Sequence, residues 1–450
     1  MKPFSLSCRH RTLLLLCATL ATLATLAGCG GGGGGDDSAS ASSSRATPAS
    51  PAAPASSAST PNASTPAGAA STPLADAPTG GDASPSAGVP KSTTPNVHAI
   101  AVGLAPGLTR NMLTTSVTVC QSGTSNCATI DNIQVDTGSH GLRILASALP
   151  ASLGLPATAS GSGVAGECAV FGGGYTWGAV RTADVRMAGQ LAASLPIQVI
   201  ADPAVPNVPD DCASSGSAMQ TVASLRSNGI LGVGLFAADC GSACASTAAP
   251  RWYYGCDASG ACASSTQAVA QQVTNPVSRF PLDNNGVVID LPAIADDGAA
   301  SVSGSMIFGI DTQPNNMLGA ASVIKANAAT GYVSTKTATY TNSRSYIDSG
   351  SNGIFFRTAQ LPQCGYWYCP SSMTMESATI LGTDGASAAI SFAVGNSSSL
   401  FASSNNAFND LAGVATGSFG WGLPFFFGRR VYTAISGRDT SAGPGPYYAF

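Results

Sequence analysis

VDTGSHGLRI at residues 135–144 is repeated in outline by IDSGSNGIFF at residues 347–356. Both stretches read apolar, Asp, Thr or Ser, Gly, Ser, polar, Gly, apolar. The two aspartates are Asp136 and Asp348, and each lies between two apolar runs. The repeat therefore predicts two similar strand-to-loop turns, each carrying one carboxylate, in the two halves of the chain.

Ordinary turn chemistry is the alternative explanation of this repeat, because Asp and Gly are common turn residues. The chain has other Asp-Gly pairs, at Asp297 and at Asp384. These pairs lack the hydroxyl residue between Asp and Gly, and no Ser follows them. Two extended copies of the longer pattern favour a paired site over coincidental turns.

The rest of the chain after residue 95 has the two-residue periodicity of strands, with turn residues at short intervals. Helical candidates are few and short, and the best is 266–273. We therefore expect an all-β chain with small helical inserts. The strand-like runs are 116–119, 133–135, 183–187, 197–200, 287–289, 305–308, 337–340, 390–392 and 431–433.

Paired carboxylates suit hydrolysis by an activated water. Two carboxylates brought face to face cannot both ionise cheaply, so the pair holds one shared proton over a range of pH. The ionised partner can take a proton from water, and the protonated partner can polarise a carbonyl group. Asp136 and Asp348 are thus the candidate catalytic residues. The residues expected to support the pair, by hydrogen bonding or close backbone approach, are Thr137, Gly138, Ser139, Ser349, Gly350 and Ser351.

The paired motifs resemble those of the pepsin-like aspartic proteases, over most of residues 100–450. The resemblance implies a bilobal acid-protease fold with two β-barrel-like lobes, a central cleft and few short helices. We expect an N-terminal lobe with inter-lobe strands at 96–325 and a C-terminal lobe at 326–450. The chain is also similar to an uncharacterised family of exported proteobacterial proteins that carry the same two motifs.

A glycine-rich flap over the substrate is a further feature of the pepsin-like family. FGGGYTWG at residues 171–178 occupies a similar position. The resemblance assigns Phe171, Gly172 and Tyr175 to the flap and substrate cleft. Phe171 stands where the family has a tyrosine, so the usual hydroxyl is missing unless Tyr175 replaces it.

Three further segments resemble parts of the same family. ILGVGL at 230–235 matches the segment that crosses beneath the first catalytic loop, and FGWG at 419–422 is a looser match for the second. GSMIFGID at 304–311 resembles the strand between the lobes. His140 follows Ser139 directly, and we expect an exposed loop histidine there, or else a titrating neighbour of the site.

The N-terminal segment has the features of an export signal. A basic leader and an apolar run end in LAGC at 26–29, which resembles a bacterial lipobox with Cys29 as the lipidated residue. An ordinary signal peptide cleaved near Ala27 is the alternative. We expect a lipoprotein signal peptide at 1–28, followed by a disordered Gly/Ala/Ser/Pro tether at 29–95.

Ten cysteines follow the export segment, and an even number in an exported chain indicates a disulfide framework. Cys120 with Cys127 and Cys364 with Cys369 are close local pairs, whereas the full connectivity stays open. A zinc site is the alternative for four of the remaining cysteines. Those four are Cys240, Cys244, Cys256 and Cys262.

These observations predict an exported, lipid-anchored protein of the cell envelope, at the outer membrane or facing the periplasm. We expect a monomeric aspartic endopeptidase that acts on polypeptides, with no cofactor and no metal. Only 9% of the residues are charged, with no basic patch, so nucleic acid is not an expected partner. The alternatives are a non-catalytic protein that binds a peptide-like ligand, and a structural surface lipoprotein whose two Asp loops are unrelated turns.

Overall fold

Strands supply most of the regular structure in the computed structural model, which describes residues 93–161, 163–249 and 251–450. The expected all-β class is therefore confirmed. The helices of this part of the chain are short. The α-helices are α1 (Asp210–Ala213), α2 (Val222–Leu225), α3 (Ser242–Ser246) and α4 (Ser397–Ala402). The 3-10 helices are η1 (Pro106–Leu108), η2 (Ala146–Ala148), η3 (Ala151–Leu153), η4 (Val269–Gln271), η5 (Pro276–Arg279), η6 (Pro314–Asn316) and η7 (Leu423–Phe425).

The larger of two sheets has 16 strands and draws on the beginning, middle and end of the chain. Its strands are β1 (Val97–Val102), β2 (Leu113–Cys120), β3 (Cys127–Asp136), β4 (His140–Leu145), β5 (Ala159–Ser160), β6 (Gly163–Phe171), β7 (Gly174–Met187), β8 (Gln190–Ile200), β9 (Gly229–Val233), β10 (Tyr253–Cys256), β11 (Cys262–Ser264), β12 (Gly286–Leu291), β13 (Val302–Phe308), β14 (Val323–Lys325), β24 (Arg429–Ala434) and β25 (Tyr447–Ala449).

Six strands of the larger sheet close on themselves. β2 pairs with β3, β3 with β9, β9 with β4, β4 with β8, β8 with β7, and β7 with β2 again. The closed ring leaves these strands few free edges. Apolar side chains fill its interior, among them Val117, Val135 and Leu231, which have no exposed surface.

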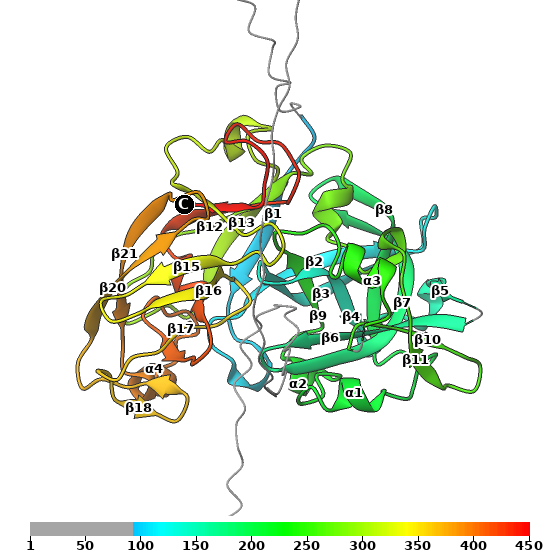
Figure 1. The fold of residues 1–450 in the computed structure, drawn as a ribbon, viewed down its shortest axis with the longest axis horizontal. Helices are drawn as coiled ribbons and strands as arrows, with labels where there is room; N and C mark the ends of the chain where they lie inside the picture. Colours follow the sequence, from blue (N-terminus) through cyan, green and yellow to red (C-terminus); the bar gives the residue numbers. More distant parts are fainter. Residues whose placement is uncertain (1–92, 162, 250) are drawn as a thin grey trace, which may run out of the picture. The chain divides into compact units, whose positions relative to one another are not determined.

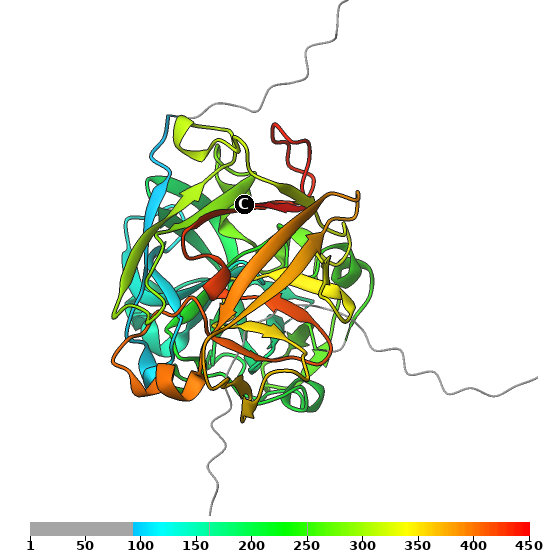
Figure 2. The same ribbon diagram turned by 90° about the vertical axis from the view of Figure 1, so that its left-hand side faces the viewer.

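The smaller sheet has nine strands, all from one continuous part of the chain. They are β15 (Val333–Lys336), β16 (Thr341–Ile347), β17 (Ile354–Phe356), β18 (Gln363–Cys364), β19 (Trp367–Tyr368), β20 (Thr374–Leu381), β21 (Ser387–Val394), β22 (Ala412–Val414) and β23 (Phe419–Trp421). Figure 1 shows these strands, coloured yellow to red-orange, on the left and the ring of six, cyan to green, on the right. The β20–β21 hairpin crosses the front in Figure 2.

One continuous apolar core serves both sheets. It includes Val135 and Leu231 of the larger sheet together with Ile347 and Trp421 of the smaller one. The chain passes into the smaller sheet between β14 and β15, and β24 and β25 then return to the larger sheet. The two Asp loops are therefore held by a shared core, which fixes them relative to each other.

Two local expectations from the sequence are wrong. The expected helix at 266–273 contains only the 3-10 turn η4, and the buried amide of Gln272 bonds backbone groups of Gly241 and Gln267. The expected strand at 337–340 is the turn between β15 and β16, where Thr337 accepts a hydrogen bond from the Tyr340 amide. The local bond of Thr337 competes with regular structure, whereas Gln272 is held by a partner far away in the sequence.

Five disulfides confirm the predicted framework. They join Cys120 to Cys127, Cys168 to Cys212, Cys240 to Cys244, Cys256 to Cys262, and Cys364 to Cys369. The four cysteines considered for zinc are thus paired with one another as disulfides. Disulfides of this number indicate an oxidising environment outside the cytosol.

The predicted leader at 1–28, Cys29 and all but the last three residues of the predicted tether lie outside the described residues. Among the helices from residue 93 onward, none combines the length and apolar character that a bilayer crossing requires.

Candidate active site

The two Asp loops occupy matching positions in a duplicated arrangement of three strands. Asp136 ends β3, and the chain then turns into β4; both strands pair with β9, β3 in parallel and β4 antiparallel. Asp348 directly follows β16, and β16 and β17 pair in the same two senses with β23. Each aspartate therefore lies at the buried end of a central strand, where the backbone is held on both sides.

Two residues from opposite halves of the chain lock these loops together. Ser349 donates its amide to Thr137 Oγ1 over 2.9 Å, and Thr137 donates its amide to Ser349 Oγ over 3.1 Å. The hydroxyls in turn donate to strand carbonyls on the opposite side: Thr137 to Ile347 at 3.2 Å, and Ser349 to Val135 at 2.8 Å. The reciprocal bonds fix the two loops face to face.

Each carboxylate is held by its own loop in the same way. Asp136 accepts the Gly138 amide at Oδ1 over 2.8 Å and the Ser139 hydroxyl at Oδ2 over 2.5 Å. Asp348 accepts the equivalent groups, the Gly350 amide at 2.8 Å and the Ser351 hydroxyl at 2.7 Å. Both aspartates have no exposed surface. Their orientations are therefore set by backbone and hydroxyl donors.

The glycines of the motifs bring each loop against the opposite carboxyl group. A Cβ atom on Gly138 would lie 2.6 Å from Asp348 Cγ, and one on Gly350 would lie 2.6 Å from Asp136 Oδ1. Real Cβ atoms do not approach other atoms so closely, so a larger residue at either position would push the carboxyl groups apart.

The two carboxyl groups differ in how firmly each holds a proton. Burial raises the pKa of both, and the raised pKa of Asp348 increases further because the charge of Asp136 opposes its ionisation. Hydrogen bonds from Asp348, Ser139 and Gly138, together with the positive charge of Arg143, counteract this rise at Asp136. The arrangement therefore favours a proton on Asp348, donated in a hydrogen bond to an ionised Asp136.

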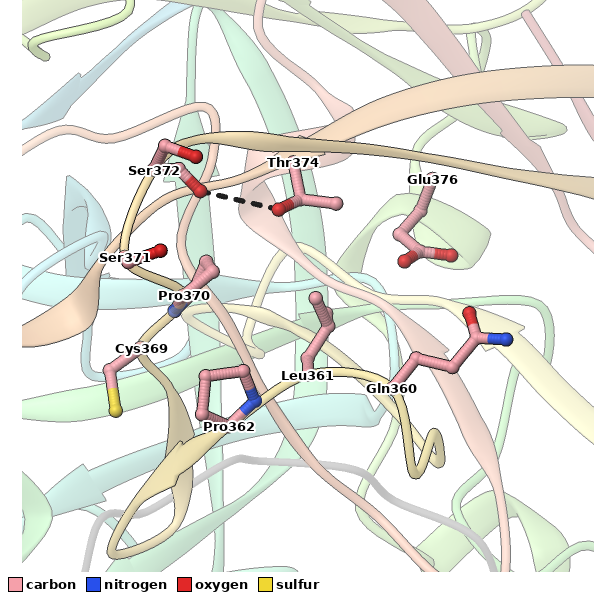
Figure 3. A pocket seen from close by; sticks show the side chains of 9 residues that line it. All are labelled: Gln360, Leu361, Pro362, Cys369, Pro370, Ser371, Ser372, Thr374 and Glu376. Atoms are coloured by element: carbon pink, nitrogen blue, oxygen red, sulfur yellow. Dashed lines mark hydrogen bonds between the residues drawn. The ribbon is translucent and has the colours of Figure 1, made fainter.

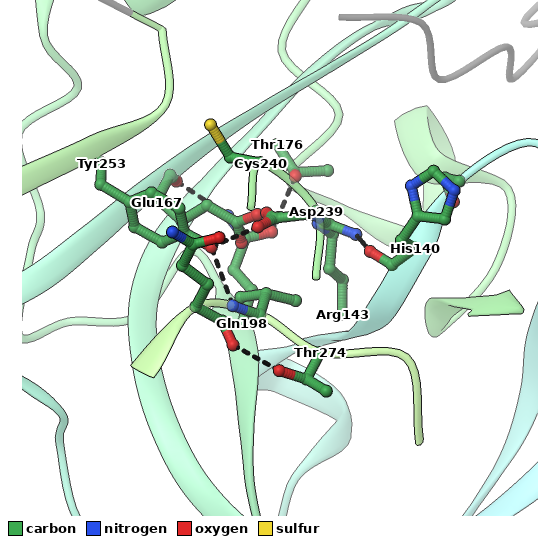
Figure 4. Close-up of polar contacts among 12 residues, drawn as sticks. His140, Arg143, Glu167, Thr176, Gln198, Asp239, Cys240, Tyr253 and Thr274 are labelled. Atoms are coloured by element: carbon green, nitrogen blue, oxygen red, sulfur yellow. Dashed lines mark hydrogen bonds and ion pairs between the residues drawn. The ribbon is translucent and has the colours of Figure 1, made fainter. Parts of the chain in front are cut away.

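Several residues near the first loop were not singled out from the sequence. Arg143, on β4, bonds Glu167 and Asp239, and Tyr253 donates to Asp239 over 2.6 Å (Figure 4). Arg143 could have been noticed in the sequence, because an arginine interrupts the apolar end of the first motif. Gln134 also bonds across the halves, to the Gly350 carbonyl at 2.9 Å.

The flap candidates lie on a hairpin formed by β6 and β7. Gly172 is exposed in the turn between Phe171 and Gly174, which face each other across the hairpin. The Phe171 ring is buried in an apolar cluster with Leu145 and Ile230. Tyr175 is buried in a different cluster, beside Trp177 and the Cys168–Cys212 disulfide. The structure thus brings together the two Asp motifs, whereas the hairpin aromatics pack into clusters of their own.

His140 is not the exposed loop residue that the sequence suggested. Its ring packs edge-on against Phe236, with the ring centres 5.2 Å apart. Burial lowers the pKa of His140 to about 3, and the nearby charge of Arg143 adds to the effect. The imidazole is therefore neutral and packs as an aromatic ring beside the first loop.

A pocket of about 420 Å³ lies elsewhere, in the part of the chain that forms the smaller sheet (Figure 3). It is lined by the segment around Leu361 and Pro370 and by Glu376 on β20, and neither Asp loop contributes to it. No group of three or more potential metal ligands gathers in the described part of the chain.

Comparison with known proteins gives a family without an assigned activity. No curated protein matches this chain. A family model described as "Protein of unknown function (DUF3443)" matches residues 92–450, which include both Asp loops and every strand of both sheets. The chain therefore belongs to the DUF3443 family.

Proposed function

We propose that this protein is an exported aspartic endopeptidase that uses Asp136 and Asp348 to activate water for peptide-bond hydrolysis. The reciprocal lock between Thr137 and Ser349 carries the proposal. Unrelated turns have no reason to exchange backbone and hydroxyl bonds in matched pairs, whereas a shared site requires its two halves to be fixed. The lock thus argues against a purely structural role for the loops.

The duplicated strand arrangement supports a pepsin-like fold for the site. In each half, a strand, an Asp loop and a second strand all rest on one later strand, β9 or β23. A fold with two such halves places one carboxylate from each at their junction, and we propose that the substrate binds across that junction.

The proposed role of each aspartate follows from which of the two carboxyl groups is protonated. Ionised Asp136 would accept a proton from a water molecule as the water attacks the peptide carbonyl carbon. Protonated Asp348 would donate to the carbonyl oxygen as negative charge develops there. Asp136 then gives the proton that it took from water to the departing amine as the carbon–nitrogen bond breaks. Asp348 takes back a proton from a hydroxyl of the tetrahedral intermediate as the carbonyl group re-forms, which restores the starting state of the pair.

The cellular setting proposed from the sequence is the bacterial cell envelope. Five disulfides support an oxidising compartment. A lipid at Cys29, followed by the tether at 29–95, would hold a monomeric domain at the outer membrane or facing the periplasm. Labelling with a radioactive fatty acid, in the parent protein and in Cys29→Ser, tests the anchor.

A non-catalytic protein that binds a peptide-like ligand on the same fold is the second candidate. The observation that favours it is the hairpin: Phe171 has no hydroxyl and is packed into an apolar cluster. Retained binding of peptides with no cleavage would support this reading.

A cleavage assay tests the proposal. The full-length protein is incubated with an unfolded protein substrate between about pH 3 and pH 7, where a coupled carboxylate pair changes state. Asp136→Asn and Asp348→Asn should each abolish cleavage, and a statine-type transition-state analogue should inhibit it. Asp384→Asn, in an exposed Asp-Gly turn, is the matched control and should retain activity. Cleavage that survives both dyad substitutions contradicts the proposal.

A further inference from the structure

Arg143 is the one arginine or lysine that is buried among the described residues. Its side chain is only 3% exposed, and its partners Glu167 and Asp239 are 0% and 4% exposed. One nitrogen, Nη2, bonds Glu167 at 2.5 Å and Asp239 at 3.0 Å, whereas Nη1 donates to the His140 carbonyl at 2.7 Å. The guanidinium carbon, Cζ, also lies 5.7 Å from the centre of the Phe171 ring.

These contacts connect four segments that are separate in the sequence (Figure 4). His140 begins β4 directly after the first Asp loop, Glu167 and Phe171 belong to the β6–β7 hairpin, and Asp239 belongs to the segment that follows β9. Tyr253, on β10, completes the cluster through its bonds to Asp239 and to the Val273 amide. A single guanidinium group thus joins the catalytic loop to the hairpin next to it.

The second copy of the motif shows that the strand after the Asp loop does not need a cation at the position of Arg143. The residue seven positions after Asp348 is Phe355, which packs against Trp367 with ring centres 5.4 Å apart. An apolar residue at this position is therefore compatible with the same three-strand arrangement. Buried ion pairs contribute little net stability relative to well-packed apolar groups, so stability alone does not explain Arg143.

Arg143 also acts on the site electrostatically. Its positive charge lowers the pKa of Asp136 relative to the value that burial alone would give. The two acidic partners limit this field, and burial together with the charge of Asp239 raises the pKa of Glu167 well above its ordinary value.

We infer that Arg143 is a positioning residue of the active site, which fixes the β6–β7 hairpin and the Asp136 loop relative to each other through Glu167, Asp239 and the His140 carbonyl. The inference rests on the proposed function, because it assigns a role in that site. It also makes a purely structural claim, that the two segments are coupled through one side chain, and this claim can be measured without any substrate.

Hydrogen–deuterium exchange on the full-length protein tests the structural claim. Arg143→Met has a similar length but offers no donors, so exchange should rise by about tenfold or more in residues 136–142 and in the hairpin at 163–174. The second Asp loop, at 348–354, should change far less. Arg181→Met is the control, because Arg181 on β7 also forms an ion pair, with Asp202, but lies in a more exposed position away from the first Asp loop. This substitution should leave exchange at 136–142 unchanged.

Arg143→Lys keeps the inference testable if Arg143→Met does not fold. Lysine keeps the buried positive charge but lacks the planar fork that reaches several acceptors at once. It should fold and give an intermediate rise in exchange at 136–142. Wild-type exchange in this loop in either folded variant overturns the inference, as does an equal rise in both Asp loops.

Kinetic measurements then test whether the coupling between the hairpin and the Asp136 loop affects catalysis. With cleavage established for the parent protein, kcat of Arg143→Met should fall about 100-fold, the size expected for a misplaced reacting group, with a smaller change in KM. Arg143→Lys should recover part of the loss, and Arg181→Met should match the parent. A parent protein that cleaves nothing contradicts the proposed function, yet the exchange measurements still decide the coupling. A folded Arg143→Met with parental kcat overturns the positioning role.

Discussion

Replacing Thr137 with valine should weaken the contact between the two Asp loops and so lower the stability of the protein. Valine has nearly the same shape but can neither donate to the Ile347 carbonyl nor accept the Ser349 amide, bonds of 3.2 and 2.9 Å in the parent. Both backbone groups are buried, so the variant loses two hydrogen bonds and leaves their partners unsatisfied. At about 1–3 kcal/mol for each such group, we expect the free energy of unfolding to fall by about 2–6 kcal/mol.

Urea unfolding at neutral pH, with the disulfides intact, measures this loss. Thr433→Val is the matched control, because Thr433 is equally buried but its hydroxyl has no hydrogen-bond partner within the described residues. The same substitution there should leave stability unchanged or slightly increased, since it removes an unpaired buried polar group. Equal effects of the two substitutions would refute the reasoning, because the loss at Thr137 would then reflect threonine-to-valine replacement in general.

Three further predictions concern the buried acids and the glycine contact. Because the pKa of Asp348 is raised in the folded state, its contribution to stability is complete below about pH 3.8 and is lost as pH rises through the folded-state pKa. Thermal unfolding from pH 3 to 8 should therefore show that the stability of Asp348→Asn increases relative to that of the parent as pH rises. Asp410, whose pKa is raised to about 6 chiefly by burial, should behave alike, with Asp410→Asn gaining between pH 3.8 and about 6 and a flat difference contradicting the assignment. Gly138→Ala should abolish cleavage, because its Cβ would lie 2.6 Å from Asp348 Cγ, whereas Gly417→Ala, with no atom nearby, should be silent in the same assay.

The two Asp loops are the part of the site that could be predicted, because they appear in the sequence as a repeated motif. The two Asp motifs are recognisable because each loop needs the same residues for the same local bonds, and these bonds span only two or three positions. The alternation of apolar and polar residues along the long strands could likewise be recognised in the sequence. Short-range patterns of this kind need no knowledge of the tertiary structure.

Contacts between distant segments could not be predicted in this way. The Thr137–Ser349 lock joins residues 212 positions apart, and hydroxyl residues are too common in this chain to indicate a partner. The Cys168–Cys212 disulfide spans 44 positions and was equally open, whereas Cys120–Cys127 was suggested by proximity. The failed helix at 266–273 has the same origin, because Gln272 takes its partners from the tertiary structure.

One departure from the repeat adds to the difference between the two carboxyl groups, beyond the interaction of the pair itself. A perfectly duplicated site would give both aspartates the same surroundings, with no reason for either to hold the shared proton. The loops supply equivalent donors to both, but the seventh position after the aspartate is Arg143 in one copy and Phe355 in the other. The cation favours ionisation of Asp136 alone. Under the proposed function, the residue that joins the hairpin to the first loop would therefore also help to keep Asp136 as the base and Asp348 as the acid.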